Sequence, residues 1–154
     1  MKKFLTLLIT FVCLFSVCAC QKTKTEEIVL PTLEVTAGEA QVTAKEGTHS
    51  WMTKDRAVAS DYPPPSAFKE YIPVLKTSDM AAVFTFDNSP DEVFVKCWSD
   101  NYIDEFDPPT ETLFCDGSKL ELKSGGYIYE VLAKWDKNDI PNGDVLYYFY
   151  AIVE

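Results

Sequence analysis

The sequence predicts an all-β fold, an antiparallel β-sandwich of about seven to nine short strands. Short runs rich in β-branched and aromatic residues alternate with period two, and clusters of Gly, Pro, Asn and Asp separate them. Aromatic residues make up 14% of the chain, which is typical of a globular protein rather than a disordered one. No segment carries the apolar stripe of a long amphipathic helix. These observations together favour stacked sheets over a helical or mixed fold.

The first 19 residues have the layout of a bacterial export signal. A positive start at Met1–Lys3 precedes the uncharged stretch Phe4–Ala19, and Cys20 follows. The uncharged stretch is shorter than the roughly 20 apolar residues that a spanning helix needs. We therefore expect residues 1–19 to be a lipoprotein signal peptide that is cleaved.

The tetrapeptide Val17-Cys18-Ala19-Cys20 resembles the lipobox of bacterial lipoproteins. It has an aliphatic residue three places before Cys20 and a small residue just before it, whereas Cys18 departs from the usual small or hydroxylated residue. Were Cys18 the acceptor, Val17 would stand where a small residue is needed. The resemblance implies lipid attachment at Cys20, so that membrane lipid holds the chain on the outer face of the cytoplasmic membrane. Plain secretion and an uncleaved anchor are the alternatives.

The chain is strongly acidic. Loss of Lys2 and Lys3 with the signal peptide would move the formal net charge from −10 to −12. This acidity argues against a nucleic-acid partner, because phosphates require a basic footprint, and we expect none. Electrostatic adhesion to anionic lipid is disfavoured as well, so membrane contact is expected through the acyl chains alone.

Residues 20–30 read as the lipidated cysteine and a flexible tether, and residues 31–154 have the size of one domain. Four weaker strands are expected in the first half of that domain. They span Thr32 to Thr36, Ala40 to Lys45, Ala57 to Ser60 and Ile72 to Lys76.

Two hairpins are expected further along. Ala82 to Phe86 and Val93 to Trp98 flank a turn with Asn88 and Pro90, while Leu120 to Lys123 and Tyr127 to Trp135 flank Ser124-Gly125-Gly126. The last strand, Val145 to Val153, pairs most simply with residues 127–135.

The alternation within residues 127–135 predicts which side chains are buried. Glu130 and Lys134 mark a solvent face, so the residues in phase with Val131 should face the core. Those residues are Tyr127, Tyr129, Val131, Ala133 and Trp135.

An immunoglobulin-like arrangement of these strands is expected, with a closed barrel as the alternative. The segments GTHSW (47–51), GGYIYEVLAKW (125–135) and GDVLYYFY (143–150) resemble a pattern in small, uncharacterised lipoproteins of Gram-positive, clostridia-type bacteria. The resemblance covers most of residues 32–154 and rests on glycines and core aromatics. It implies an immunoglobulin-like sandwich in the cell envelope and names no catalytic residue.

The residues that would carry enzyme chemistry are sparse. His49 is the only histidine, no serine lies in a Gly-x-Ser-x-Gly turn, and neither a Walker pattern nor a dinucleotide fingerprint is present. We therefore expect no cofactor and no enzyme activity. A glycan hydrolase that uses two carboxylates is the remaining catalytic alternative.

An acidic stretch lies between Cys97 and Cys115 and contains no basic residue. Its oxygens suit a calcium ion, but the spacing fits no EF-hand, so a solvated loop is the alternative. The candidate ligands are Asp100, Asp104, Glu105 and Asp107, followed by Glu111. A second set of the same kind comprises Asp136, Asn138, Asp139 and Asp144. We expect no dedicated metal site.

Cys97 and Cys115 are the only cysteines after Cys20. Outside the membrane they have the opportunity to form a disulfide, which would stabilise the fold by about 3 kcal/mol. Two buried free thiols are the alternative, since Cys97 is in phase with Val93 and Val95.

Both faces of the last strand are apolar. If one face is exposed, Tyr148 and Tyr150 form an aromatic binding platform, and if both are covered they pack in the core. The sequence thus favours a non-catalytic binding or sensing module for an unknown envelope protein or glycan. An accessory subunit that docks on an envelope membrane protein is the alternative.

Overall fold

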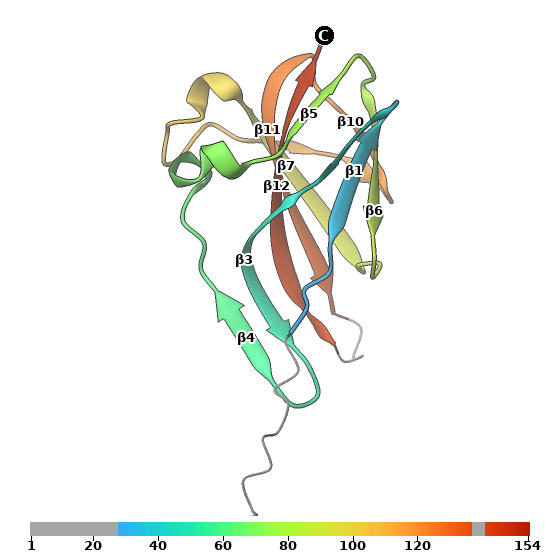
Figure 1. The fold of residues 1–154 in the computed structure, drawn as a ribbon, viewed down its shortest axis with the longest axis vertical. Coiled ribbons are helices and arrows are strands. Elements are labelled where there is room, and N and C mark those ends of the chain that lie inside the picture. Colours follow the sequence, from blue (N-terminus) through green and yellow to red (C-terminus); the bar gives the residue numbers. More distant parts are fainter. Residues whose placement is uncertain (1–27, 137–140) are drawn as a thin grey trace, which may run out of the picture.

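The computed structural model describes residues 28–136 and 141–154. Cys20, the signal peptide and residues 21–27 of the expected tether lie outside this part of the chain. The described residues form a β-sandwich of two sheets, one with five strands and one with seven, which confirms the predicted sandwich (Figure 1). Ile28 and Leu30, expected within the tether, already pack against the core.

The five-stranded sheet has the order β2-β1-β6-β10-β9. Its strands are β1 (Leu33–Ala37), β2 (Ala40–Thr43), β6 (Ala81–Phe86), β9 (Cys115–Asp116) and β10 (Lys119–Glu121). All of its pairings are antiparallel.

The seven-stranded sheet has the order β4-β3-β12-β11-β7-β8, and β5 pairs with β12 beside that path. Its strands are β3 (Lys45–Met52), β4 (Ala57–Ser60), β5 (Val74–Thr77), β7 (Glu92–Ser99), β8 (Glu111–Leu113), β11 (Gly125–Trp135) and β12 (Asn142–Val153). The β5–β12 pairing is parallel. Three 3-10 turns complete the described part: η1 (Pro65–Ala67), η2 (Lys69–Tyr71) and η3 (Asp100–Tyr102).

Strands β11 and β12 form the centre of the larger sheet. They pair antiparallel over their whole length, from Gly125 opposite Val153 to Trp135 opposite Gly143, which confirms the predicted pairing. The predicted inward-facing residues of β11 lie in the main core cluster or, for Tyr127, pack against it. In that core Tyr129 stacks on Phe149 with ring centroids 4.8 Å apart. Such aromatic pairs add to the stabilisation that apolar burial gives.

Two strand segments pass from one sheet to the other. The segment 40–52 pairs as β2 in the small sheet, passes the buried Ala44 and pairs as β3 in the large sheet. On the opposite side, β8 pairs with β7, and after Phe114 the same segment pairs as β9 with β10. Continuous chain segments therefore join the two sheets along both sides of the sandwich. A closed barrel, the alternative that the sequence left open, would also have no open sides, but here two separate sheets remain.

Both predicted hairpins are wrong. Strand β6 belongs to the small sheet and β7 to the large one, so the turn between them crosses the sandwich. In the same way β10 and β11 lie in different sheets, and Gly125 and Gly126 begin β11 instead of forming a tight turn. A turn signal indicates only that a strand ends, whereas the burial of both apolar faces decides which sheet the next strand joins.

The described part holds twelve strands, more than the seven to nine predicted. The four weaker strands of the first half exist, and β4 has the predicted bounds. β3, β8 and β9 were largely missed. β3 carries polar residues at most positions and an irregular register between Val145 and Tyr147 of its partner, so its alternation is hidden.

The solvent face predicted for β11 is also only partly correct. Ile128, on the same face as Glu130, is fully buried because the segment with η1 and η2 lies over this side of the large sheet. Phe68 and Ile72 of that segment form a second apolar cluster with Ile128 and two neighbouring aromatics, Trp98 and Tyr148. The large sheet is thus covered on both sides over this area.

No helix within residues 28–136 and 141–154 is both long and apolar enough to cross a bilayer.

Candidate functional site

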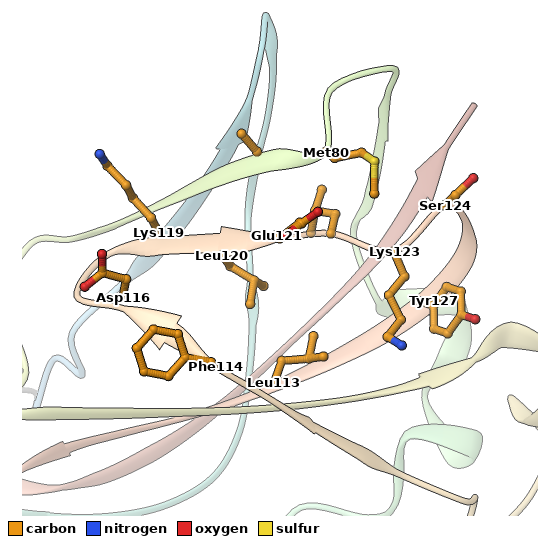
Figure 2. A pocket seen from close by; sticks show the side chains of 12 residues that line it. Met80, Leu113, Phe114, Asp116, Lys119, Leu120, Glu121, Lys123, Ser124 and Tyr127 are labelled. Atoms are coloured by element: carbon orange, nitrogen blue, oxygen red, sulfur yellow. The ribbon is translucent and has the colours of Figure 1, made fainter.

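An open groove lies beside β8, β9 and β10, at the side of the sandwich where the chain changes sheet. It has a volume of about 900 Å³. Figure 2 shows Phe114, Leu113 and Leu120 on one side of it and Lys123 with Tyr127 on the other. Its volume falls within the range found for small-molecule pockets, and its lining is both apolar and charged.

The floor of the groove comes from the alternation of β10 and the residues after it. Leu120 and Leu122 point inward and are buried, while Lys119 and Glu121 point to solvent. The β9–β10 hairpin brings these residues to the sheet edge through Gly117 and Ser118. Gly117 has φ 61°, the conformation that the first position of such a two-residue turn requires.

Lys123 fixes one wall of the groove. Its backbone N–H donates to the Tyr129 hydroxyl at 2.7 Å, and its Nζ donates to Glu111 Oε2 at 2.5 Å. The hydrogen bond to Glu111 raises the pKa of Lys123. The same ammonium lies 5.7 Å from the centroid of the Tyr127 ring. This cation is therefore engaged by the protein itself.

The apolar wall is unusually exposed. Phe114 is 85% exposed and Met80 is 42% exposed. Phe114 projects at the point where the chain leaves β8 and has not yet entered β9, so no neighbouring strand covers it. Two exposed acids, Asp116 and Glu121, also line the groove.

The two cysteines of the domain are both free thiols, so the disulfide left open by the sequence is not formed in this structure. Cys97 lies on β7 opposite Glu111 of β8 and is buried in the core. Burial raises its pKa to about 11. Cys115 on β9 is half-buried, its Sγ lies 3.4 Å from the Gly117 carbonyl oxygen, and burial raises its pKa too.

We expect an alkylating reagent at pH 8 to modify Cys115 well before Cys97, because only a thiolate reacts and Cys97 is both buried and protonated. Mass spectrometry of peptides after timed iodoacetamide treatment measures the two rates. Both thiols should react at similar rates in urea, which serves as the control. Equal rates in the folded protein would contradict the buried position of Cys97.

The acidic candidates for calcium are not gathered. Asp104 pairs with Lys69, Glu111 pairs with Lys123, and Asp100 Oδ2 accepts from the Tyr150 hydroxyl at 2.7 Å. Within the described ranges no three His, Cys, Asp or Glu side chains are arranged to hold a metal ion. The candidates Glu105 and Asp107 are exposed. The second candidate set includes Asn138 and Asp139, which lie outside the described residues.

Tyr148 and Tyr150 do not form an exposed platform. Tyr148 is 5% exposed, lies 5.4 Å from Phe68 in an edge-to-face contact, and donates its hydroxyl to Glu130 at 3.1 Å. Tyr150 is half-buried, and its bond to Asp100 holds the η3 turn. Burial raises the pKa of Tyr150 to about 12. The sequence left open an exposed platform or core packing for these two residues, and in the structure both tyrosines pack against other parts of the fold.

His49 lies away from the groove, on β3. Its Nδ1 lies 3.0 Å from the Gly47 carbonyl oxygen, and it lines a second hollow together with Ile28, Arg56 and Val58. The lining of this hollow consists of aliphatic residues together with Thr32, Glu46, His49 and Arg56.

Sequence reasoning missed the groove. Its residues come from β8, β9 and β10, from the starts of β6 and β11 and from the residues beside them, which no local pattern links. The signal that could have pointed to it was Phe114, one of the aromatic residues within the acidic stretch between Cys97 and Cys115. The predicted lipid site, Cys20, lies outside the described residues.

Searches against protein-family models, curated proteins and solved structures each find no match to this chain.

Proposed function

We propose that this chain is a lipoprotein anchored through Cys20 to the outer face of the cytoplasmic membrane, and that its sandwich is a non-catalytic binding or sensing module. The supporting observation is the position of the two ends of the body. Ile28 lines a hollow with Arg56, which lies between β3 and β4. The C-terminus follows β12 at the end of the body opposite the β3–β4 hairpin (Figure 1).

The distance from the anchor follows from this position. Ile28 comes eight positions after Cys20, and an extended chain of that length reaches at most about 27 Å. A lipid on Cys20 therefore keeps the β3–β4 end of the sandwich close to the bilayer. The groove lies at the side of the sandwich, and its lining reaches Ser124 and Tyr127, near the pairing of Gly125 with Val153 at the end away from the membrane.

An immunoglobulin-like arrangement of the sandwich belongs to the same proposal. Its support is the crossing of the chain between the two sheets after β6 and after β10, together with the sheet change of the segment 40–52. In such folds the framework positions the loops, and the binding chemistry lies in side chains outside the core.

The groove favours binding over hydrolysis. A carboxyl group that acts as a proton donor is normally kept protonated by burial or by a second acid nearby. The two acids of the groove, Asp116 and Glu121, are both exposed and lie on separate strands, β9 and β10. No charged side chain is buried in the part of the chain that the structure describes.

Replacing Cys20 with alanine is expected to abolish lipid attachment and processing at this position, because the thiol is the group that accepts the lipid. The measurement is metabolic labelling with an alkyne fatty acid in a bacterial host that matures lipoproteins, followed by fractionation. Wild-type chain should carry the label and fractionate with membranes, and the Cys20→Ala chain should carry none.

Cys18→Ala is the matched control, since it removes a thiol two residues away and should leave the labelling intact. Label that persists in Cys20→Ala, or wild-type chain that is found full-length in the cytosol, would overturn the proposed anchor.

A further inference from the structure

We propose that the tip of the β3–β4 hairpin, Met52 to Arg56, contacts the anionic headgroups of the membrane that carries the chain and thereby orients the sandwich. This inference rests on the proposed function, since it takes Cys20 as the anchor. It adds a lipid contact of the folded body to that of the acyl chains, which is the only one that the sequence predicts.

The tether meets the body beside this hairpin. Ile28 comes eight positions after Cys20 and lines a hollow with Arg56. Figure 1 shows the β3–β4 hairpin reaching further toward this end of the body than the described ends of β6, β11 and β12. The hairpin is therefore the described element that a membrane carrying the lipid meets first.

The side chains of the tip suit the headgroup layer. Met52 is apolar and yet 50% exposed. Lys54 and Arg56, both exposed, stand on either side of one acid, Asp55. Basic side chains of this length keep the charged group among the headgroups while their aliphatic part lies against apolar chains. Val29, 77% exposed, adds a second apolar side chain beside the same hollow.

Two hydrogen bonds hold the turn in place. The backbone N–H of Thr53 donates to the Arg56 carbonyl oxygen at 2.7 Å, and the Thr53 hydroxyl donates to the same oxygen at 3.1 Å. A turn that is already ordered loses little conformational entropy when it meets a surface.

The distribution of charge turns the body in the same sense. Residues 45–60, which include the hairpin, carry three basic and two acidic residues, a net charge of +1. Residues 100–121 carry one basic and seven acidic residues, a net charge of −6, and their first turn, η3, lies toward the opposite end (yellow in Figure 1). An anionic membrane repels the second segment and attracts the first.

Three further acids lie beside β6, β7 and β11 at the hairpin's end of the body: Asp87, Asp91 and Asp136. The carboxylate of Asp87 accepts the Thr32 N–H at 3.0 Å, and that of Asp91 accepts the Asp136 N–H at 2.9 Å. The described ends of these strands are further from the membrane than the tip (Figure 1). Because the field of a charge falls off over a Debye length of about 8 Å, the tip counts most.

A net charge of +1 and two apolar side chains are too few to hold a free body on a bilayer. The anchor removes this requirement, because a tethered tip meets the surface at a high effective concentration. The acyl chains thus supply the affinity, and the hairpin sets the orientation.

The test uses the full chain, matured in a host that processes lipoproteins and reconstituted into vesicles of phosphatidylglycerol with a doxyl-labelled phosphatidylcholine as quencher. A thiol-reactive fluorophore is attached to Ala57→Cys, opposite Met52, in a Cys115→Ser chain. Ser89→Cys, between β6 and β7, is the matched control, and Ser124→Cys reports the far end. We expect quenching at position 57 to be at least about threefold stronger than at either control position.

Two charge variants locate the contact. Lys54→Glu is expected to lower the quenching at position 57 at least about twofold, because it places a negative charge against anionic headgroups. Lys96→Glu is the matched control, since it makes the same change of charge at an exposed position on β7, away from the tip. Circular dichroism checks the fold of each variant.

Equal quenching at positions 57 and 89 would overturn the proposal, and so would equal effects of Lys54→Glu and Lys96→Glu. A contact that forms in native membranes and not in vesicles of pure lipid would assign the tip to a membrane protein instead. The fatty-acid label on Cys20 is measured on the same samples. A chain without that label would overturn the anchor, and this contact with it, whereas a labelled chain with equal quenching would overturn the contact alone.

Discussion

Replacing Gly143 with alanine is expected to destabilise the fold by about 4 kcal/mol or more, among the largest effects of a single substitution. Gly143 has φ 144°, a conformation that side-chain-bearing residues rarely adopt. A Cβ at this position would lie 2.0 Å from the Ser50 carbonyl oxygen and 2.9 Å from the Trp51 Cα. Both are backbone atoms of β3, which cannot move aside without breaking the β3–β12 pairing.

The position of Gly143 explains the close approach. It pairs with Trp51 on one side and with Trp135 on the other, and the rings of these two tryptophans meet edge to face at 5.1 Å. The absence of a side chain at Gly143 leaves room for them. Urea unfolding of the chain beginning at Gln21, followed by circular dichroism, measures the effect.

Gly117→Ala is the matched control for this substitution. Gly117 also has a positive φ, 61°, but a Cβ there would meet no atom within 4 Å. The backbone preference alone should then cost about 1 to 2 kcal/mol. If Gly143→Ala cost no more than Gly117→Ala, the close packing of β12 against β3 would be contradicted.

Replacing Trp135 with alanine is expected to cost about 3 to 5 kcal/mol, the range for loss of a large aromatic side chain from a core. Trp135 is 5% exposed and contacts Trp51 and Phe86, with ring centroids 5.1 Å and 6.1 Å away. Its Nε1–H also donates to the Asn88 carbonyl oxygen at 3.1 Å, which ties the β6–β7 crossing to β11. The substitution therefore opens a cavity and removes the hydrogen bond that holds the β6–β7 crossing against β11.

Trp135→Phe separates these two contributions, because it keeps a ring and removes only the N–H. We expect it to cost about 1 to 2 kcal/mol, the loss of one hydrogen bond with some packing. The free energies of unfolding come from the same urea titrations. A loss below about 1 kcal/mol for Trp135→Ala would be typical of a surface residue and would contradict the core position.

The sequence predicts which residues are buried better than it predicts which sheet each successive strand joins. Alternation along residues 127–135 identifies the residues of that strand that face the main core, because one apolar face must be covered in any arrangement, and the sequence also predicts its pairing with residues 145–153. The same alternation cannot distinguish a hairpin from a crossing, since β7 and β11 have the same period whether they follow a tight turn or cross the sandwich. Only the packed sheets settle that choice.

The candidate site was predictable only in part. Cys97 and Tyr148 carried clear apolar patterns, yet their burial depends on distant segments: β8 lies beside Cys97, and Phe68 covers Tyr148. Phe114 is the opposite case: it is an apolar residue, but no sequence pattern predicted whether it is buried or exposed. Its exposure follows from the change of sheet between β8 and β9, which neither short strand reveals on its own.

The strand segments that join the two sheets leave little open backbone at the sides of the body. The outermost strands, β2, β4, β8 and β9, have four residues or fewer in the described part. A fibril grows by adding copies along a long, flat, unprotected strand, and short outer strands offer a poor template for it. A surface crowded with copies of this domain would therefore resist conversion to amyloid, even though its core strands are rich in the residues from which amyloid is built.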